Sequence, residues 1–325
     1  MARVMHPGQK TFWHLLGAGR VPSRYEVVST RLDYARAPGF EVDTPLAVWY
    51  ARHQTGSELG KGAWDDFADP AATTYATYVA RRRDDEVYLD QLLDSDDLEL
   101  AFRPGSTQLH GLRELYREVI GPLRFPCHGL QMAAAYLAHL APASRVSIAA
   151  LFQAADELRR VQRLAYRLRQ VELADEELSI PAREAWQRHP AWQPLRRLIE
   201  RLLVTYDLGE AFAALNLVVK PAFDELLLEE LGAAAERLGE PVLARLLRAL
   251  AGDGRWHRAW SLELVRVLAG SGAEHARSLQ RWVESWRAET WDAMHSVWSL
   301  LPNQAFLRTA VERHALDVDR ALEHG

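Results

Sequence analysis

The stretch that predicts the architecture reads Leu151-Phe-Gln-Ala-Ala-Asp-Glu-Leu-Arg-Arg160-Val-Gln-Arg-Leu-Ala-Tyr-Arg-Leu168. Its apolar residues recur at intervals of three, four and seven, the spacing of one face of an α-helix. Ser144 or Ser147 is placed to cap the start of this helix. The stretch therefore predicts a long amphipathic helix that buries one face.

The same helical period continues on both sides of this stretch, from about residue 69 onward. Asp69-Pro70 and Asp207-x-x-Glu210 are typical helix starts, and Gly121-Pro122 is expected to end a helix. Pro221 is expected to kink the apolar helix that contains it. Further helices are predicted over about 69–93, 96–120, 123–141, 194–204, 207–228 and 240–268. Long helices with short breaks predict an all-α fold, a ferritin-like bundle of the kind found in ribonucleotide reductase.

Residues 1–68 differ from the rest, because they carry glycine, proline and scattered aromatic residues without a sustained helical period. We therefore expect two parts, an extended and mostly irregular arm at 1–68 and a ferritin-like helical domain at 69–325. Large aromatic side chains outside regular helices need cover, either on the chain's own fold or on a partner. The aromatic residues predicted to contact partner subunits are Trp13, Tyr25, Trp49, Tyr50, Trp64 and Phe67.

Composition restricts the environment of the chain. The net charge is −5, from 39 basic and 44 acidic residues, so no general attraction to nucleic acid or anionic membranes is expected. The basic run Arg81–Arg83 is followed at once by three acidic residues and is expected to form a solvated helix face. A single cysteine, no signal-peptide pattern and no apolar run of about 18–20 residues together predict a cytoplasmic protein.

A motif expected of such a bundle is missing. In di-iron bundles, two helices each carry Glu-x-x-His and hold the metal pair. None of the 325 residues begins such a motif. The two related segments read Glu157-Leu-Arg-Arg160 and Gly254-Arg-Trp-His257. By spacing alone, Glu157 and Arg160 fit an ion pair on a helix surface, and His257 fits a hydrogen-bonded core or surface histidine.

Three other combinations are weaker candidates for chemistry. Asp292-x-x-His295 is a single acid and histidine pair with no second copy to complete a metal site. Asn216 and Lys220 lie one turn apart in an apolar helix and are expected to bond within the bundle or to a second chain. Cys127 and His128 are adjacent and point about 100° apart, so they predict a buried cysteine and no catalytic dyad.

Ordered segments spread over nearly the whole chain carry a family resemblance. They are Pro22-Ser-Arg-Tyr-Glu-Val-Val-Ser29, Trp64-Asp-Asp-Phe-Ala-Asp-Pro70, Leu130-Gln-Met-Ala-Ala-Ala-Tyr136, Gln153-Ala-Ala-Asp-Glu-Leu-Arg-Arg160 and Gly209-Glu-Ala-Phe-Ala-Ala-Leu-Asn-Leu-Val-Val-Lys-Pro221. With them the chain resembles the β subunit of the hydroxylase component of bacterial multicomponent monooxygenases, in the toluene, benzene and alkene branch.

The resemblance implies a non-catalytic, structural subunit without a metal or cofactor of its own. In this family an α subunit holds the di-iron centre that hydroxylates or epoxidises hydrocarbons with O2, and a γ subunit completes an (αβγ)2 hydroxylase. An effector protein, a Rieske-type [2Fe-2S] ferredoxin and an NADH-using FAD reductase act on it. Where the α subunit carries Asp-Glu-x-x-His twice, this chain has Arg160 and Gly254, so no metal role carries over to Glu157 or His257.

Two alternatives come from other classes: a self-sufficient di-iron oxidase, and a helical scaffold protein without enzymatic role. The missing ligands argue against the first, and the ordered family segments argue against the second. The substrate and its regiospecificity stay open, since the pocket belongs to the α subunit.

Overall fold

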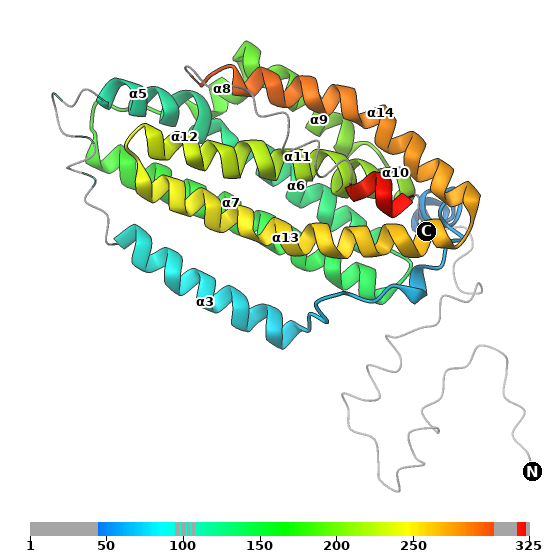
Figure 1. Ribbon diagram of the computed structural model, residues 1–325. Coiled ribbons are helices and arrows are strands. Elements are labelled where there is room, and N and C mark those ends of the chain that lie inside the picture. Colours follow the sequence, from blue (N-terminus) through cyan, green and yellow to red (C-terminus); the bar gives the residue numbers. More distant parts are fainter. Residues whose placement is uncertain are drawn as a thin grey trace, which may run out of the picture. The chain divides into compact units, whose positions relative to one another are not determined.

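The computed structural model describes residues 45–94, 98, 102, 105, 108–301 and 317–322 (Figure 1). Across these residues the chain is helical and has no β-strand, which confirms the predicted all-α class. Within the same ranges, no helix is both long and apolar enough to cross a membrane.

The chain divides into two units, Met1–Ala51 and Arg52–Gly325. In the first, the described residues include α2 (Pro45–Tyr50), where Trp49 and Tyr50 are half-buried. Trp13 and Tyr25 lie outside the described residues. The π-helical η2 (Ala51–Thr55) begins at the boundary, which falls earlier than the predicted division at residue 68.

The prediction of partner contacts is wrong for Trp64 and Phe67, because both side chains are buried inside the second unit. Trp64, in the 3₁₀ turn η3 (Trp64–Asp66), is 3% exposed and donates from Nε1 to the carbonyl of Leu59 at 2.6 Å. Phe67 is 0% exposed and meets the ring of Trp260 edge-on, with centroids 6.2 Å apart. Residues 52–68 thus belong to the helical unit and contribute to its core.

Among the described residues of the second unit, four long helical segments form the core. α6 (Gly121–Leu140) and α7 (Ser144–Ala174) make an antiparallel pair, and α13 (Pro241–Gly270) runs beside α7. The other segment is one continuous helix, made of α10 (Leu208–Phe212), η6 (Ala213–Val219), α11 (Lys220–Asp224), η7 (Glu225–Glu230) and α12 (Leu231–Arg237).

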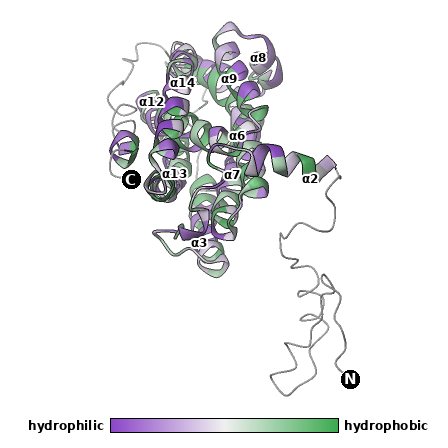
Figure 2. Ribbon diagram, turned by 90° about the vertical axis from the view of Figure 1, so that its right-hand side faces the viewer, coloured by the Kyte–Doolittle hydropathy of each residue, from purple (hydrophilic) through white to green (hydrophobic). Residues whose placement is uncertain are grey.

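Further helices cover this core on two sides. Seen from the end in Figure 2, α9 (Gln193–Leu203) and α14 (Ala273–Trp298) lie on one side of α6 and α7. On the other side α3 (Tyr75–Asp94) packs against α13. The shorter elements are α5 (Leu109–Glu114), η4 (Leu115–Ile120), α8 (Ala182–Arg188) and η5 (Pro190–Trp192).

Most helix starts follow the sequence signals. α7 begins at Ser144, and the carboxylates of Asp207 and Glu240 cap α10 and α13 by accepting the N–H of Glu210 at 3.0 Å and of Leu243 at 3.2 Å. The predicted start at Asp69-Pro70 is wrong, because α3 begins only at Tyr75. Asp69 instead accepts the N–H groups of Ala71 and Thr73, and its carboxylate thereby closes a turn ahead of the helix.

The predicted helix end at Gly121-Pro122 is also wrong, since the chain is helical from Leu109 to Leu140. A π-helical turn precedes Pro122 and another precedes Pro221, and the N–H just before each proline reaches five residues back, from Gly121 to Tyr116 and from Lys220 to Leu215. The wider turn displaces the carbonyl that an α-helical register would place against the proline ring.

Pro122 leaves the carbonyl of Glu118 without its α-helical N–H, and the indole of Trp192 donates to that carbonyl at 2.8 Å. Trp192→Phe keeps a buried aromatic ring but removes the indole N–H that donates this hydrogen bond. We therefore expect it to lower the free energy of unfolding by about 1–2 kcal/mol. Chemical denaturation measures this loss. Trp186→Phe, on neighbouring α8, is the control, and equal losses in the two variants would show that the hydrogen bond has no special role.

A buried ionic cluster at the centre of the bundle

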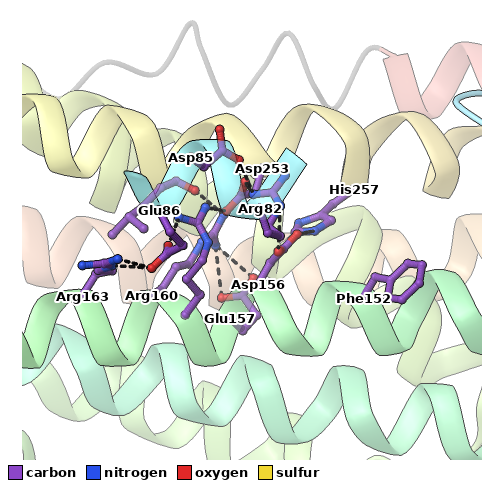
Figure 3. A network of polar contacts seen from close by, with 12 residues as sticks. Arg82, Asp85, Glu86, Phe152, Asp156, Glu157, Arg160, Arg163, Asp253 and His257 are labelled. Atoms are coloured by element: carbon purple, nitrogen blue, oxygen red, sulfur yellow. Dashed lines mark hydrogen bonds and ion pairs between the residues drawn. The ribbon is translucent and has the colours of Figure 1, made fainter. Parts of the chain in front are cut away.

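All four positions related to the missing motif are buried in one region of the bundle. Glu157 and Arg160 lie on α7, while Gly254 and His257 lie on α13. Figure 3 shows Glu157, Arg160 and His257 among further charged side chains. The sequence did not predict that these charged residues lie together. Glu157 and Arg160 are both 0% exposed, so the reading as a surface ion pair is wrong.

Glu157 and Arg160 form an inner quartet with two residues of α11, Lys220 and Asp224. The Arg160 Nη1 lies 2.9 Å from Glu157 Oε1 and 2.6 Å from Asp224 Oδ1. The Lys220 Nζ lies 2.6 Å from Glu157 Oε1 and 2.8 Å from Asp224 Oδ2. Each carboxylate therefore touches both cations, and the quartet has no net charge.

The electrostatics favour the ionised forms of Asp224 and Arg160. Burial alone raises the pKa of Asp224, but the neighbouring Arg160 and Lys220 outweigh it and hold that pKa well below its usual range. Burial opposes the charge of Arg160, yet Asp224 and Glu157 raise its pKa well above its ordinary value. The Arg160 Nη2 also donates to the carbonyl of Leu250 on α13 at 2.9 Å. The quartet thus joins α7, α11 and α13.

A second layer of charged side chains links α3 to α7 and α13 beside the inner quartet. Tyr78 donates its hydroxyl to Asp156 Oδ1 at 2.8 Å, and Arg82 forms an ion pair with Asp253. Arg159 donates to Asp253 Oδ2 at 2.5 Å and to Glu86 Oε1 at 3.0 Å. The solvated face predicted for Arg81–Arg83 is thus wrong for Arg82. Its side chain turns inward and is 13% exposed, because Asp156 and Asp253 lie opposite it.

His257 lies between the two layers. Its Nε2 is 3.0 Å from Asp156 Oδ2, while burial first and the charge of Lys220 second lower its pKa. The imidazole is therefore neutral at pH 7 and donates from Nε2. Burial raises the pKa of Asp156, but the hydrogen bond from His257 and the nearby Arg82 lower it overall, so this carboxylate stays ionised.

These pKa shifts predict a loss of stability in acid. The folded pKa of His257 lies below its ordinary 6.5, so His257 contributes fully above that pH and its contribution is lost as the pH falls through the lowered value. Asp156 and Asp224 act likewise below their ordinary 3.8. We expect the free energy of unfolding to be flat above about pH 7 and to fall below it.

Urea denaturation at several pH values measures this slope. His257→Gln is expected to flatten it between about pH 6.5 and 5, whereas His110→Gln, at an exposed histidine of α5, leaves it unchanged. A wild-type protein more stable at pH 5 than at pH 7 would contradict the assignment of a buried neutral His257.

The side chains present do not fit a di-iron centre. Glu157 and Asp224, the carboxylates that face the middle of the bundle, are already bridged by two cations that would repel a metal ion. A side chain at Gly254 would place its Cβ 2.4 Å from Asp224 Oδ2, so a glutamate does not fit there without moving Asp224. Among the described residues, no group of three or more His, Cys, Asp or Glu is arranged to hold a metal.

The other sequence candidates are accounted for in the bundle. Asn216 donates to Gln153 and Ser261, and Lys220 to the quartet, so both bond within the bundle as expected. Cys127 is fully buried, and burial raises the pKa of its thiol. Asp292 and His295 are exposed on α14. Asp224 was not predicted from the sequence, although it follows Lys220 by four residues, the spacing of ion pairs on one face of a helix.

The family model of methane, phenol and alkene hydroxylases matches residues 49–272. The chain belongs to this family. The hydroxylase component subunit beta of the toluene-4-monooxygenase system of Ectopseudomonas mendocina is 33% identical over 314 residues, covering 94% of each chain. The hydroxylase component small subunit of propane 2-monooxygenase from Gordonia sp. (strain TY-5) is 28% identical over 151 residues, covering 45% of this chain and 41% of that one.

Solved structures of this family share the fold. A toluene 4-monooxygenase structure with toluene bound in its resting active site contains a chain 31% identical to this one, with a TM-score of 0.76, covering 91% of this chain and 99% of that one. A chain of xenon-pressurised phenol hydroxylase from Pseudomonas sp. OX1 is 18% identical, with a TM-score of 0.72 and 99% and 97% coverage, and supports the fold alone. The predicted family, its helical bundle and its monooxygenase hydroxylase class are confirmed.

Proposed function

We propose that this chain is the non-catalytic, structural β subunit of a multicomponent monooxygenase hydroxylase that oxidises aromatic hydrocarbons or alkenes in the cytoplasm. The inner quartet carries this proposal, since two permanent cations stand between the carboxylates that would otherwise face a metal. The name of its relative, a subunit beta of a toluene monooxygenase system, supports the same role.

In the assembly we propose, the di-iron centre lies in a larger α subunit and a γ subunit completes an (αβγ)2 hydroxylase. The electrons come from NADH through an FAD reductase and a Rieske-type [2Fe-2S] ferredoxin, and an effector protein binds the hydroxylase. A self-sufficient di-iron oxidase is disfavoured by the quartet, and an unrelated scaffold is disfavoured by the family.

One surface of the second unit fits a subunit contact. On α7, Ile148, Leu151 and Leu158 are 46%, 55% and 43% exposed, and with exposed Ala155 they follow the three-four spacing of a coiled-coil seam. α6 packs between α7 and α9. On α6, the helix that pairs with α7, Met132 is also apolar and 40% exposed. We call this surface the α6–α7 face.

A pocket lies on the far side of α6 from α7, where α6 meets α9 and α10. It has a volume of about 180 Å³ and is lined by Met132, Ala133, Tyr136, Leu202, Leu203 and Ala211. Exposed Met132 belongs both to this pocket and to the α6–α7 face. The pocket is therefore large enough to take an apolar side chain of a partner that reaches Met132.

We propose that the larger hydroxylase subunit binds the α6–α7 face with an apolar helix. The seam spacing favours a helix as the opposing element, and the lack of charge along the exposed seam residues favours an apolar one. The relatives are named subunit beta and small subunit, which imply a larger subunit beside them. The arm residues Trp13, Tyr25, Trp49 and Tyr50 are proposed as further contacts with the same partner.

Reconstitution tests the function. We expect the isolated chain, supplied with O2, NADH, the reductase, the ferredoxin and the effector protein, to leave toluene unchanged. With the same components, the chain combined with a γ subunit and a larger subunit bearing two Glu-x-x-His motifs is expected to oxidise it. Equal oxidation by the isolated chain would overturn the proposal.

A deletion tests the arm. Removing residues 2–44 is expected to weaken binding to the larger subunit, because aromatic anchors carry much of an interface's affinity. The melting temperature of the deletion variant shows whether the helical unit stays folded. Unchanged affinity, measured by titration of the two purified chains, would remove the arm from the interface.

A further inference from the structure

A second buried polar cluster, of uncharged side chains, lies one turn from the inner quartet. Asn216, in the π-helical η6, donates from Nδ2 to Gln153 Oε1 at 2.9 Å and to Ser261 Oγ at 2.8 Å. Ser261 donates to the carbonyl of His257 at 2.6 Å. Gln153, Asn216 and Ser261 are 1%, 3% and 1% exposed, so bulk water does not reach them.

The hydrogen-bonding capacity of this cluster is only partly used. Within the described part of the chain, Gln153 Nε2 and Asn216 Oδ1 have no hydrogen-bond partner. The same holds for two side-chain atoms on the adjoining turns of α13, His257 Nδ1 and Trp260 Nε1. Buried polar atoms are rarely left unpaired, because each has given up its bonds to water. The four atoms comprise two donors and two acceptors.

Turning the side-chain amides of Gln153 and Asn216 by 180° still leaves polar atoms of these amides without a partner. If both were turned, Gln153 Nε2 would donate to Asn216 Oδ1, and Ser261 could donate to the same oxygen only by giving up its hydrogen bond to the His257 carbonyl. Gln153 Oε1 and Asn216 Nδ2 would then be left without partners. Either orientation leaves one donor and one acceptor unpaired at the same place, so the need for a further partner does not depend on the assignment of oxygen and nitrogen.

The chemistry of these atoms selects the ligand. A partner must accept from an N–H and donate to an oxygen or an imidazole nitrogen, which excludes a simple anion or a metal cation. A cation is disfavoured further by Lys220, one turn along from Asn216, whose charge already lowers the pKa of His257. A neutral molecule that both donates and accepts, in a site closed to solvent, is water.

We infer that Gln153 and Asn216 form a binding site for buried water, in which at least one molecule bridges the two amides. His257 Nδ1 and Trp260 Nε1 are the next atoms that such water would bond. The site lies where α7, η6 and α13 meet. Water at this site would join the three helices by hydrogen bonds, in addition to the ion pairs of the ionic cluster.

A crystal structure that resolves ordered water tests the inference directly. We expect a water molecule within hydrogen-bond distance of both the Gln153 and Asn216 amides. The inference fails if both amides are instead fully paired to protein groups. Magnetic relaxation dispersion of water nuclei gives a second measurement, because it counts internal water with long residence times.

The double variant Gln153→Leu/Asn216→Leu is expected to lose at least one such molecule. Gln280→Leu, at an amide of α14 that pairs with Glu284, is expected to lose none. An unchanged count in a folded double variant would overturn the assignment. If the double variant does not fold, the wild-type crystal structure decides.

Discussion

Arg160→Met is expected to lower the free energy of unfolding by about 3–5 kcal/mol, the cost of breaking a buried ion pair by removing one partner. Arg160 is 0% exposed and contacts both Glu157 and Asp224, so its loss leaves two buried carboxylates with Lys220 as their nearest cation. Urea denaturation measures the change. A protein at the lower end of ordinary stability, about 5 kcal/mol, would be close to unfolding.

Two further variants separate charge from packing. Arg163→Met, one turn along α7, removes a guanidinium that is 13% exposed and pairs with Glu86 and Asp90, and we expect a loss below about 1 kcal/mol. Glu157→Gln added to Arg160→Met restores neutrality and is expected to recover part of the lost stability. Equal losses for Arg160→Met and Arg163→Met would contradict the account of the quartet.

Leu151→Glu combined with Leu158→Glu is expected to weaken binding to the larger hydroxylase subunit roughly 100-fold or more. Both side chains are exposed, at 55% and 43%, so the isolated chain should keep its melting temperature. In the complex, however, two carboxylates would be removed from water against an apolar surface. Co-purification with a tagged larger subunit measures the effect, followed by titration of the purified chains.

The matched control is Val87→Glu on α3. Val87 is 50% exposed and apolar like the two leucines, but it belongs to α3 and not to the α6–α7 face. We expect it to leave binding unchanged. If Val87→Glu disrupts the complex while the double variant co-purifies normally, the interface lies on the α3 side and the proposed docking surface is wrong.

The sequence predicted the long helices well because their signals are local. The spacing of apolar residues around Leu151–Leu168 and the caps at Asp207 and Glu240 act within one or two turns, and the structure has these helices. The helix end predicted at Gly121-Pro122 was wrong because the wide turn before Pro122 has a partner elsewhere, the Trp192 indole that bonds the carbonyl of Glu118.

The candidate site was only half visible for a similar reason. Glu157, Arg160 and His257 stood out through a motif, and all three are buried together. Asp224, which pairs with Arg160, and Arg82, which pairs with Asp156 and Asp253, come from distant segments. Neither spacing nor composition shows that α3 and α11 meet α7. Trp64 and Phe67 were predicted to contact a partner because the residues that cover them could not be recognised in the sequence. Leu59, which accepts from Trp64, lies outside the predicted helices, and Trp260, which packs on Phe67, is distant in sequence.

Internal cations hold this bundle together in place of metal ions. The iron content of the chain, measured after co-expression with the larger subunit and separation from it, tests this directly. We predict that iron stays with the larger subunit, that this chain carries far less than one iron per molecule, and that chelators leave its melting temperature unchanged. Stoichiometric iron in the separated chain, with unfolding on its removal, would contradict the account.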